Sequence, residues 1–168
     1  SMTNISGATT VWDGAVSSYD DEYSLALPLG FTFTYFGTDF SEIYASTNGW
    51  ISFYSPTNSE YTNSNIPDVG TPYGVIAPFW DDFTITNEGT TDKVSYVTTG
   101  VAPNRVFTIE YFSVTRYLTT DYTDFQVKLY ETSNSIEFHY GTNSLSTGSA
   151  SIGIENNGGT IGYCGPNC

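Results

Sequence analysis

The sequence of 168 residues predicts an all-β fold, an antiparallel β-sandwich of about nine or ten strands with little or no helix. Three observations predict it. Aromatic residues make up 17% of the chain, and such side chains favour half-buried strands. Apolar residues do not recur at the three- and four-residue spacing of an amphipathic helix. Short segments rich in β-branched and aromatic residues instead recur between Gly, Pro, Asn and Asp, which is typical of a sandwich or a barrel.

The first half of the chain carries the clearest strand signals. Residues 25–35 alternate apolar and polar positions on either side of Pro28, as half-buried strands do. Residues 43–54 give the strongest hairpin signal, because two alternating runs flank Asn48-Gly49. An Asn-Gly pair readily adopts two positive φ angles, so we predict a type I′ turn at these two residues.

A long irregular stretch follows the hairpin. Residues 55–73 contain three prolines and many Ser, Thr and Asn residues. A loop of this length in a small domain is often functional. It leads into "GVIAPFWDDF", residues 74–83, which predicts a strand that carries two adjacent carboxylates.

The second half of the chain is a series of short strands and turns. Polar and apolar residues alternate within each segment, and Gly, Asn, Asp and Pro separate the segments. The predicted strands lie within residues 93–100, 105–117, 125–131, 136–141, 149–156 and 160–163. The short connections favour antiparallel pairing between neighbours.

The chain length suits a single domain. We expect residues 1–24 to pack on the sandwich, residues 25–163 to form it, and residues 164–168 to be a tail or the start of a further module. The two cysteines, Cys164 and Cys168, have a C-x3-C spacing that could close a small disulfide loop. Such a disulfide would fit an oxidising compartment.

The composition is strongly acidic. Eighteen Asp and Glu residues stand against four Lys and Arg residues, which gives a formal net charge of −14. Such a surface repels phosphate backbones and anionic membranes, so we expect no nucleic-acid partner. No apolar run approaches the roughly 18 residues of a membrane-spanning helix, so we expect no membrane insertion. No signal peptide is visible, and Ser1-Met2 is typical of a tag remnant.

Two long segments and several short ones occur in a familiar order. The long ones are "LPLGFTFTYFGTDFSEIYASTNGWISF" and "GVIAPFWDDF", and the short ones include "APNR", "FQVKLYE" and "ASIGIEN". Over residues 25–162 this order resembles the NIDO domain of nidogen-type extracellular proteins and similar modules of bacterial surface proteins. The resemblance implies an antiparallel β-sandwich in a secreted or cell-surface protein with an adhesive or matrix role. Asp81 departs from the pattern, because the family has an alanine there, in "FWAD".

We expect no enzymatic activity. Adjacent residues of a regular strand point to opposite faces, so Asp81 and Asp82 could not face one substrate as a glycosidase pair does. The only histidine, His139, alternates with Phe138 in a predicted strand, where a surface or packing role is usual. The sequence contains no G-x-S-x-G, P-loop or dinucleotide-binding motif. The family resemblance also does not imply a catalytic residue, because the matching positions are typical of structural ones.

Two acidic segments are candidates for calcium binding, and Ca²⁺ is the one cofactor that the sequence suggests. Calcium prefers oxygen ligands from Asp, Glu, Asn and main-chain carbonyl groups. The candidate ligands are Asp20, Asp21 and Glu22 in "YDDEY", and Asp81 and Asp82 in "WDDF". The alternative is a solvated turn at the first segment and a strand end at the second. No EF-hand spacing occurs.

The long loop offers candidates for carbohydrate binding, which uses exposed aromatic faces together with a few polar side chains. The candidate residues are Tyr54, Tyr61, Tyr73, Asn63 and Asn65. The alternative is that these tyrosines pack the loop against the sheet. We expect Trp50 and Trp80 to pack between the sheets and Trp12 to anchor the N-terminal segment.

These observations favour a non-catalytic extracellular adhesion or structural module of a larger protein, with Ca²⁺ as a candidate stabiliser. A carbohydrate-binding module is the alternative. The expected partner is an extracellular protein or a glycan, and the oligomeric state stays open. If strand alternation buries Phe79 and Phe83, it also turns Asp81 inward, which is costly for an unpaired charge. A bulge, hydrogen bonds or a cation must then accommodate that carboxylate.

Overall fold

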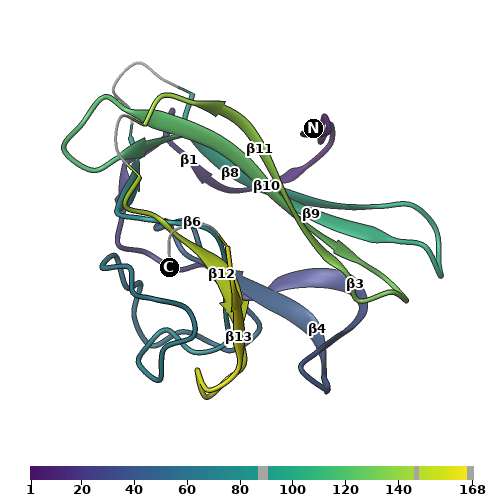
Figure 1. Cartoon of the computed structure of the whole chain (residues 1–168). Coiled ribbons are helices and arrows are strands. Elements are labelled where there is room, and N and C mark those ends of the chain that lie inside the picture. The colour runs from purple at the N-terminus through teal and green to yellow at the C-terminus, as the bar shows by residue number, and fades with distance from the viewer. Residues whose placement is uncertain (87–90, 146–147, 166–168) are drawn as a thin grey trace.

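The computed structural model describes residues 1–86, 91–145 and 148–165. Within these ranges the chain forms thirteen strands in two antiparallel sheets and no helix (Figure 1). The predicted all-β sandwich is therefore confirmed. Nine strands have five or more residues, and four short strands of two or three residues account for the higher total. In the described ranges no helix is long and apolar enough to cross a membrane.

The larger sheet has seven strands in the order β1-β8-β9-β10-β11, and β7 and β2 extend it from one end of β9. Its strands are β1 (Thr9–Asp13), β2 (Tyr19–Asp20), β7 (Phe83–Ile85), β8 (Lys93–Thr99), β9 (Val106–Arg116), β10 (Tyr122–Tyr130) and β11 (Ile136–Asn143). Strands β8 to β11 pair with their neighbours in the chain as consecutive antiparallel hairpins. Residues 1–24 contribute two strands of this sheet, β1 and β2.

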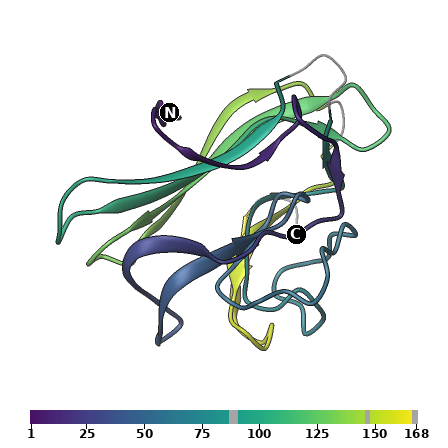
Figure 2. The same cartoon turned by 180° about the vertical axis from the view of Figure 1, so that it is seen from behind.

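The second sheet has six strands in the order β13-β12-β6-β5-β4-β3. Its strands are β3 (Leu27–Tyr35), β4 (Thr38–Ala45), β5 (Ile51–Ser52), β6 (Val75–Trp80), β12 (Ser151–Glu155) and β13 (Gly162–Cys164). Seen from behind, it forms a separate layer that carries the long loop on its outer side (Figure 2). No strand forms within residues 55–73, as predicted.

The main hydrophobic core lies between the two sheets. Strand β3 shows how the sequence builds it, because its odd-numbered residues are buried and most of its even-numbered ones are exposed. Aromatic rings link the layers: the ring centroids of Tyr111 on β9 and Phe125 on β10 lie 4.6 Å apart, and Phe125 stacks on Phe79 of β6 at 6.1 Å. The Tyr111 hydroxyl donates to the Ser46 carbonyl of the other layer at 2.8 Å.

Trp50 and Trp80 do not pack between the sheets, so that prediction is wrong. They form a second apolar cluster with Ile66, Val75 and Ala77. This cluster lies under the long loop, because both indole Nε1 groups donate to the main-chain carbonyl of residue 60, at 3.0 and 3.1 Å. The loop thus supplies the apolar cover and the acceptor that the indoles need. Trp12, by contrast, is buried in the main core from β1, where it anchors the N-terminal segment as expected.

The predicted hairpin forms, but not with the predicted turn. Strands β4 and β5 pair as expected. The Ser46 N–H donates to the Trp50 carbonyl at 2.9 Å, and Gly49 has a φ of +77°. A type I′ turn also needs a positive φ at Asn48, which is not among the residues with positive φ. The prediction failed because the Asn48 side chain is fully buried and bonds to other segments of the chain.

Candidate functional site

The segment "GVIAPFWDDF" changes sheets at Asp81-Asp82. Strand β6 pairs with β5 and β12, whereas β7 pairs with β9 of the other layer. A register shift between β6 and β12 interrupts the alternation before this crossover. Phe79, before the crossover, and Phe83, after it, both lie in the core, with ring centroids 5.8 Å apart. The two aspartates therefore occupy the connection between the layers and not a regular strand.

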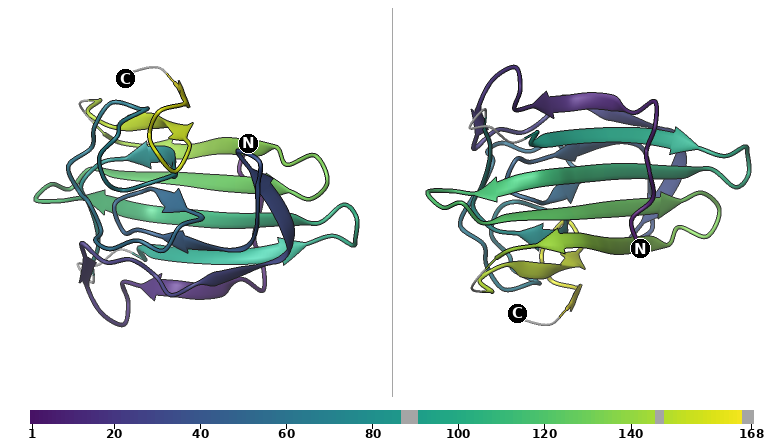
Figure 3. Two further views of the ribbon diagram at one scale, coloured as in Figure 1. Left: turned by 90° about the horizontal axis from the view of Figure 1, so that it is seen from below. Right: turned by 90° about the horizontal axis from the view of Figure 1, so that it is seen from above.

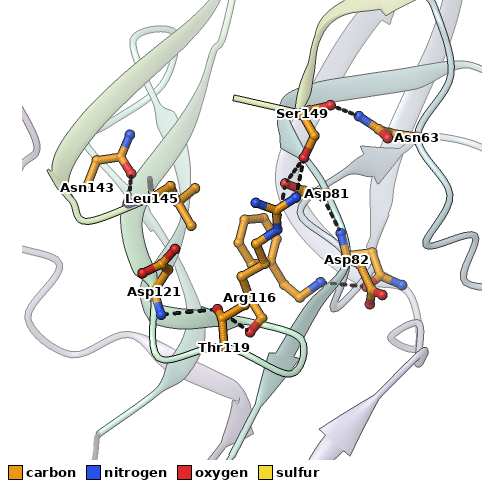
Figure 4. Close-up of polar contacts among 11 residues, drawn as sticks. Asn63, Asp81, Asp82, Arg116, Thr119, Asp121, Asn143, Leu145 and Ser149 are labelled. Carbon is orange, nitrogen blue, oxygen red and sulfur yellow. Dashed lines mark hydrogen bonds and ion pairs between the residues drawn. The ribbon is translucent and has the colours of Figure 1, made fainter. Parts of the chain in front are cut away.

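The Asp81 carboxylate is engaged by the scaffold (Figure 4). The residue is 5% exposed. Its Oδ1 accepts the main-chain N–H of Asp82 at 3.0 Å, and its Oδ2 accepts the Ser149 hydroxyl at 2.8 Å. The Arg116 Nε lies 3.5 Å from the same Oδ2. The irregular strand, the hydrogen bonds and this ion pair together accommodate the buried charge.

Asp82 joins the first acidic segment instead. Strand β2 pairs with β7 and so brings Asp20 and Asp21 beside Asp82. One carboxylate oxygen of each of these three residues lies within 4.8 Å of the others, and we call the three the acidic cluster. Asp20 and Asp21 are exposed and Asp82 is half-buried. Tyr61 of the long loop and Tyr117 line the same surface pocket.

Asn48 connects the acidic cluster to the core. Its Oδ1 accepts the main-chain N–H of Phe83 at 3.0 Å, and its Nδ2 donates to Asp21 Oδ1 at 2.9 Å. Its own carbonyl accepts the N–H of Asp81 at 3.3 Å. One fully buried side chain thus holds the first acidic segment against the sheet crossover. The sequence offered no signal for this role, because Asn-Gly pairs usually mark a turn.

The carboxylates of the acidic cluster repel one another. Burial, and after it the charges of Asp21, Asp20 and Asp81, raise the pKa of Asp82 to about 6 against the opposing effect of Arg116. Burial also raises the pKa of Asp20, and the charge of Asp21 adds to that shift. The site is therefore electrostatically unfavourable at neutral pH unless a positive charge is added.

Three of the five predicted metal ligands meet in this cluster, and two do not. Asp81 faces Arg116 and Ser149, as described above. Glu22 is exposed, and its main chain bonds to Thr47, whose N–H donates to the Glu22 carbonyl at 2.9 Å. Among the described residues, Asp20, Asp21 and Asp82 are the set whose oxygens could reach one cation together.

The candidate sugar-binding residues separate into different environments. Tyr54 and Tyr73 line a small cavity beneath the loop, of about 30 Å³, together with Trp50 and Pro72. Tyr61 lies at the acidic cluster instead. The remaining two candidates are Asn63, whose Nδ2 donates to the Ser149 carbonyl, and Asn65, which is exposed.

The predicted Cys164–Cys168 disulfide includes Cys168, which lies outside the described residues. Cys164 itself is on β13, at the edge of the six-stranded sheet.

Comparison with known families decides what kind of domain this is. A family model described as NIDO related matches residues 1–165. The chain belongs to this family. Comparisons with curated proteins and with solved structures give no match. NIDO-type domains are generally extracellular, and the NIDO-related family is not a known class of enzymes.

The stability of this NIDO-related domain should depend on pH through Asp82 when no cation is present. The pKa of Asp82 is 3.8 in the unfolded chain and about 6 in the folded one. Between these two pH values, the folded state binds a proton that the unfolded state does not. The Asp82 contribution to the free energy of unfolding therefore falls as pH rises through this window. In a chelator, we expect Asp82→Asn to be more stable than the wild type at neutral pH and to lose this advantage near pH 4.

Urea unfolding of both proteins across this pH range measures the difference. Asp39→Asn on β4, an exposed carboxylate outside the cluster, is the control and should show no such crossover. A difference between wild type and Asp82→Asn that does not change with pH would contradict the electrostatic account of the cluster.

Proposed function

We propose that this NIDO-related domain is a non-catalytic interaction module of an extracellular protein, in which Ca²⁺ bound by Asp20, Asp21 and Asp82 orders the surface that meets the partner. One observation carries the proposal: carboxylates from two segments about 60 residues apart meet within 4.8 Å at the point where the chain crosses between sheets. The extracellular character of the family supports it, because calcium is abundant outside cells and often stabilises extracellular modules at low affinity.

The donor atoms of the acidic cluster fit the preferences of calcium. The ion takes six to eight oxygen ligands in a flexible geometry. Three carboxylates offer up to six oxygens, and the exposure of Asp20 and Asp21 leaves room for water ligands. Asp21 Oδ1 already accepts a hydrogen bond from Asn48, so its Oδ2 is the freer ligand atom. Magnesium, which demands a tighter octahedral arrangement, fits this open set less well.

A bound cation would act mainly on local order. It would offset the mutual repulsion of the three carboxylates and fasten β2 to the β6–β7 crossover. Tyr61 and Tyr117 line the same pocket and are 49% and 42% exposed, so they would border the ordered site. Aromatic residues at the rim of a rigid polar site are suited to contact a protein or glycan partner.

Thermal unfolding with and without Ca²⁺ tests the proposal. At a calcium concentration of about 100 times the Kd, binding adds about 2.7 kcal/mol to the free energy of unfolding. For a domain of this size we expect the Tm to rise by about 5–10 °C. Asp21→Asn and Asp82→Asn should each remove most of this rise, whereas Asp39→Asn should keep it. A Tm that chelation leaves unchanged would refute the calcium proposal.

Carbohydrate binding is the second candidate, and the joint position of Tyr54 and Tyr73 favours it. A cavity of about 30 Å³ holds one or two water molecules and cannot enclose a sugar ring, so a glycan would lie across its rim. Tyr73, which is 47% exposed, would then be the stacking surface. A glycan array with wild type and Tyr73→Ala tests this candidate. Absence of binding to every glycan would exclude it.

A further inference from the structure

The outer face of the seven-stranded sheet carries a buried polar patch. Such a face is usually solvated, yet Gln126 on β10 is fully buried and its neighbour Lys128 is only 9% exposed. Gln126 Nε2 donates to Glu110 Oε1 on β9 at 2.6 Å. Burial raises the pKa of Glu110, as expected for a carboxyl partly removed from water.

The segment that covers this patch is the start of the chain. Residues 1–8 run across the strands of the sheet and not along them (Figure 3). Thr3 is the point of attachment: its N–H donates to Gln126 Oε1 at 3.0 Å, and its carbonyl accepts Gln126 Nε2 at 2.7 Å. The Lys128 ammonium donates to the Thr3 hydroxyl. The Gln126 carboxamide thus pairs with the main chain of one residue through both of its polar atoms.

These contacts make a site for an extended polypeptide. A side-chain amide that bonds both the N–H and the C=O of one residue recognises main chain, whatever the side chain. Lys128 adds a preference for a hydroxyl at the same position. Grooves continue on both sides of the segment, one lined by Asn4, Ile5 and Glu110 and the other by Ile5, Lys128 and neighbours on β8 and β9. The contacts that carry the inference belong to Thr3, so they do not depend on the two residues before it.

An exposed turn connects this segment to β1. Ser6 and Gly7 are exposed, and Gly7 has a φ of +76° with no atom within 4 Å of the place where a Cβ would be. The Ala8 N–H donates to the Ile5 carbonyl at 3.2 Å, which closes a tight turn. If this turn opened, residues 3–5 would extend away from their own sheet.

We propose that the face around Gln126 is a homotypic docking site, in which residues 3–5 of one copy replace those of a second copy. The contacts would be the same between two copies as within one, because the segment and the site belong to the same sequence. The free-energy difference between the two arrangements then comes mainly from the turn at Gly7 and from concentration, as in domain swapping. The proposal goes beyond the calcium site and does not depend on it.

Shortening the turn tests the exchange in the full chain. Deletion of Ser6 and Gly7 prevents residues 3–5 from folding back onto their own sheet, so we expect this variant to form dimers at concentrations where the wild type is monomeric. Adding Thr3→Pro to the deletion removes the N–H that Gln126 accepts and leaves the sheet residues unchanged. It should weaken the dimer by about tenfold or more. Asn65→Ala in the same background changes an exposed side chain of the long loop on the other sheet; it is the control and should leave the dimer intact.

Sedimentation equilibrium in a chelator measures each dissociation constant, and circular dichroism confirms that each variant is folded. A deletion variant that stays monomeric at every concentration would overturn the proposal. So would a dimer that Thr3→Pro does not weaken. Because calcium is excluded throughout, neither outcome bears on the proposed calcium site, which the thermal unfolding experiment tests separately.

Discussion

Gly49→Ala is expected to lower the free energy of unfolding by about 3 kcal/mol or more. Gly49 has a φ of +77°, and a Cβ at this position would lie 2.1 Å from the Phe79 carbonyl oxygen and 3.2 Å from the Phe83 ring. The oxygen belongs to the backbone of β6, which is hydrogen-bonded in the middle of a sheet. Neither partner can move away without disturbing the crossover that carries Asp81 and Asp82.

Gly37→Ala provides a matched control for this effect. Gly37 has a similar φ of +82°, but no atom lies within 4 Å of the position of its Cβ. Gly37→Ala should therefore lower the free energy of unfolding only by the conformational penalty of about 1–2 kcal/mol. Urea unfolding of both variants separates the contact from the backbone strain. Equal losses in the two variants would show that the approach to Phe79 is not what requires glycine at position 49.

Asn48→Ala is the second change with a large expected effect. We expect it to lower the free energy of unfolding by about 2–4 kcal/mol. The substitution leaves the buried N–H of Phe83 without its acceptor and removes the donor that orients Asp21. An unsatisfied buried donor costs more than the hydrogen bond itself contributes. This variant also loses the two longer contacts of Asn48 Nδ2 with Ser59, each at 3.4 Å. The same variant should bind Ca²⁺ more weakly, because Asp21 loses its anchor.

Two comparisons make the Asn48 prediction specific. Asn65→Ala changes an exposed amide of the long loop and should stay within about 0.5 kcal/mol of the wild type. Asn48→Asp keeps the acceptor for Phe83 but places a buried carboxylate beside Asp21, so it should be least stable at neutral pH. If chemical denaturation shows Asn48→Ala to be as stable as Asn65→Ala, Asn48 does not connect the cluster to the core.

The sandwich could be predicted because its signals are local. Alternation along residues 27–35 follows from which face of β3 meets the core, and the pairing of β4 with β5 follows from two alternating runs close together in the chain. The same holds for the hairpins from β8 to β11. These features can be predicted from a single sequence because the paired strands are close together in the chain and their apolar residues alternate with a period of two.

Other features depend on tertiary structure and left no local signal. Strand β6 alternates normally until the register shift with β12, so the sequence could not show that the chain would change sheets at Asp81. Trp50 and Trp80 are as hydrophobic as core residues, and only the path of the long loop decides that they lie on the outer face. The turn at Asn48 was mispredicted because the burial of its side chain overrides the usual Asn-Gly conformation.

The candidate site was predictable as two acidic segments but not as one cluster. Asp82 lies about 60 residues after Asp20 and Asp21, and the two-residue pairing of β2 with β7 is what joins them. No period or motif marks so short a strand. Asp81 and Glu22 looked equivalent to the other three in the sequence, yet the first faces Arg116 and the second lies outside the cluster.

A crystal structure determined with saturating Ca²⁺ tests the central proposal most directly. We predict one ion bound by oxygens of Asp20, Asp21 and Asp82 at about 2.3–2.6 Å, with water completing its shell and Asn48 still bonded to Asp21. Asp81 should remain with Arg116 and Ser149. Three carboxylates that contact only water in such a crystal, or an ion bound elsewhere in the domain, would contradict the proposed site.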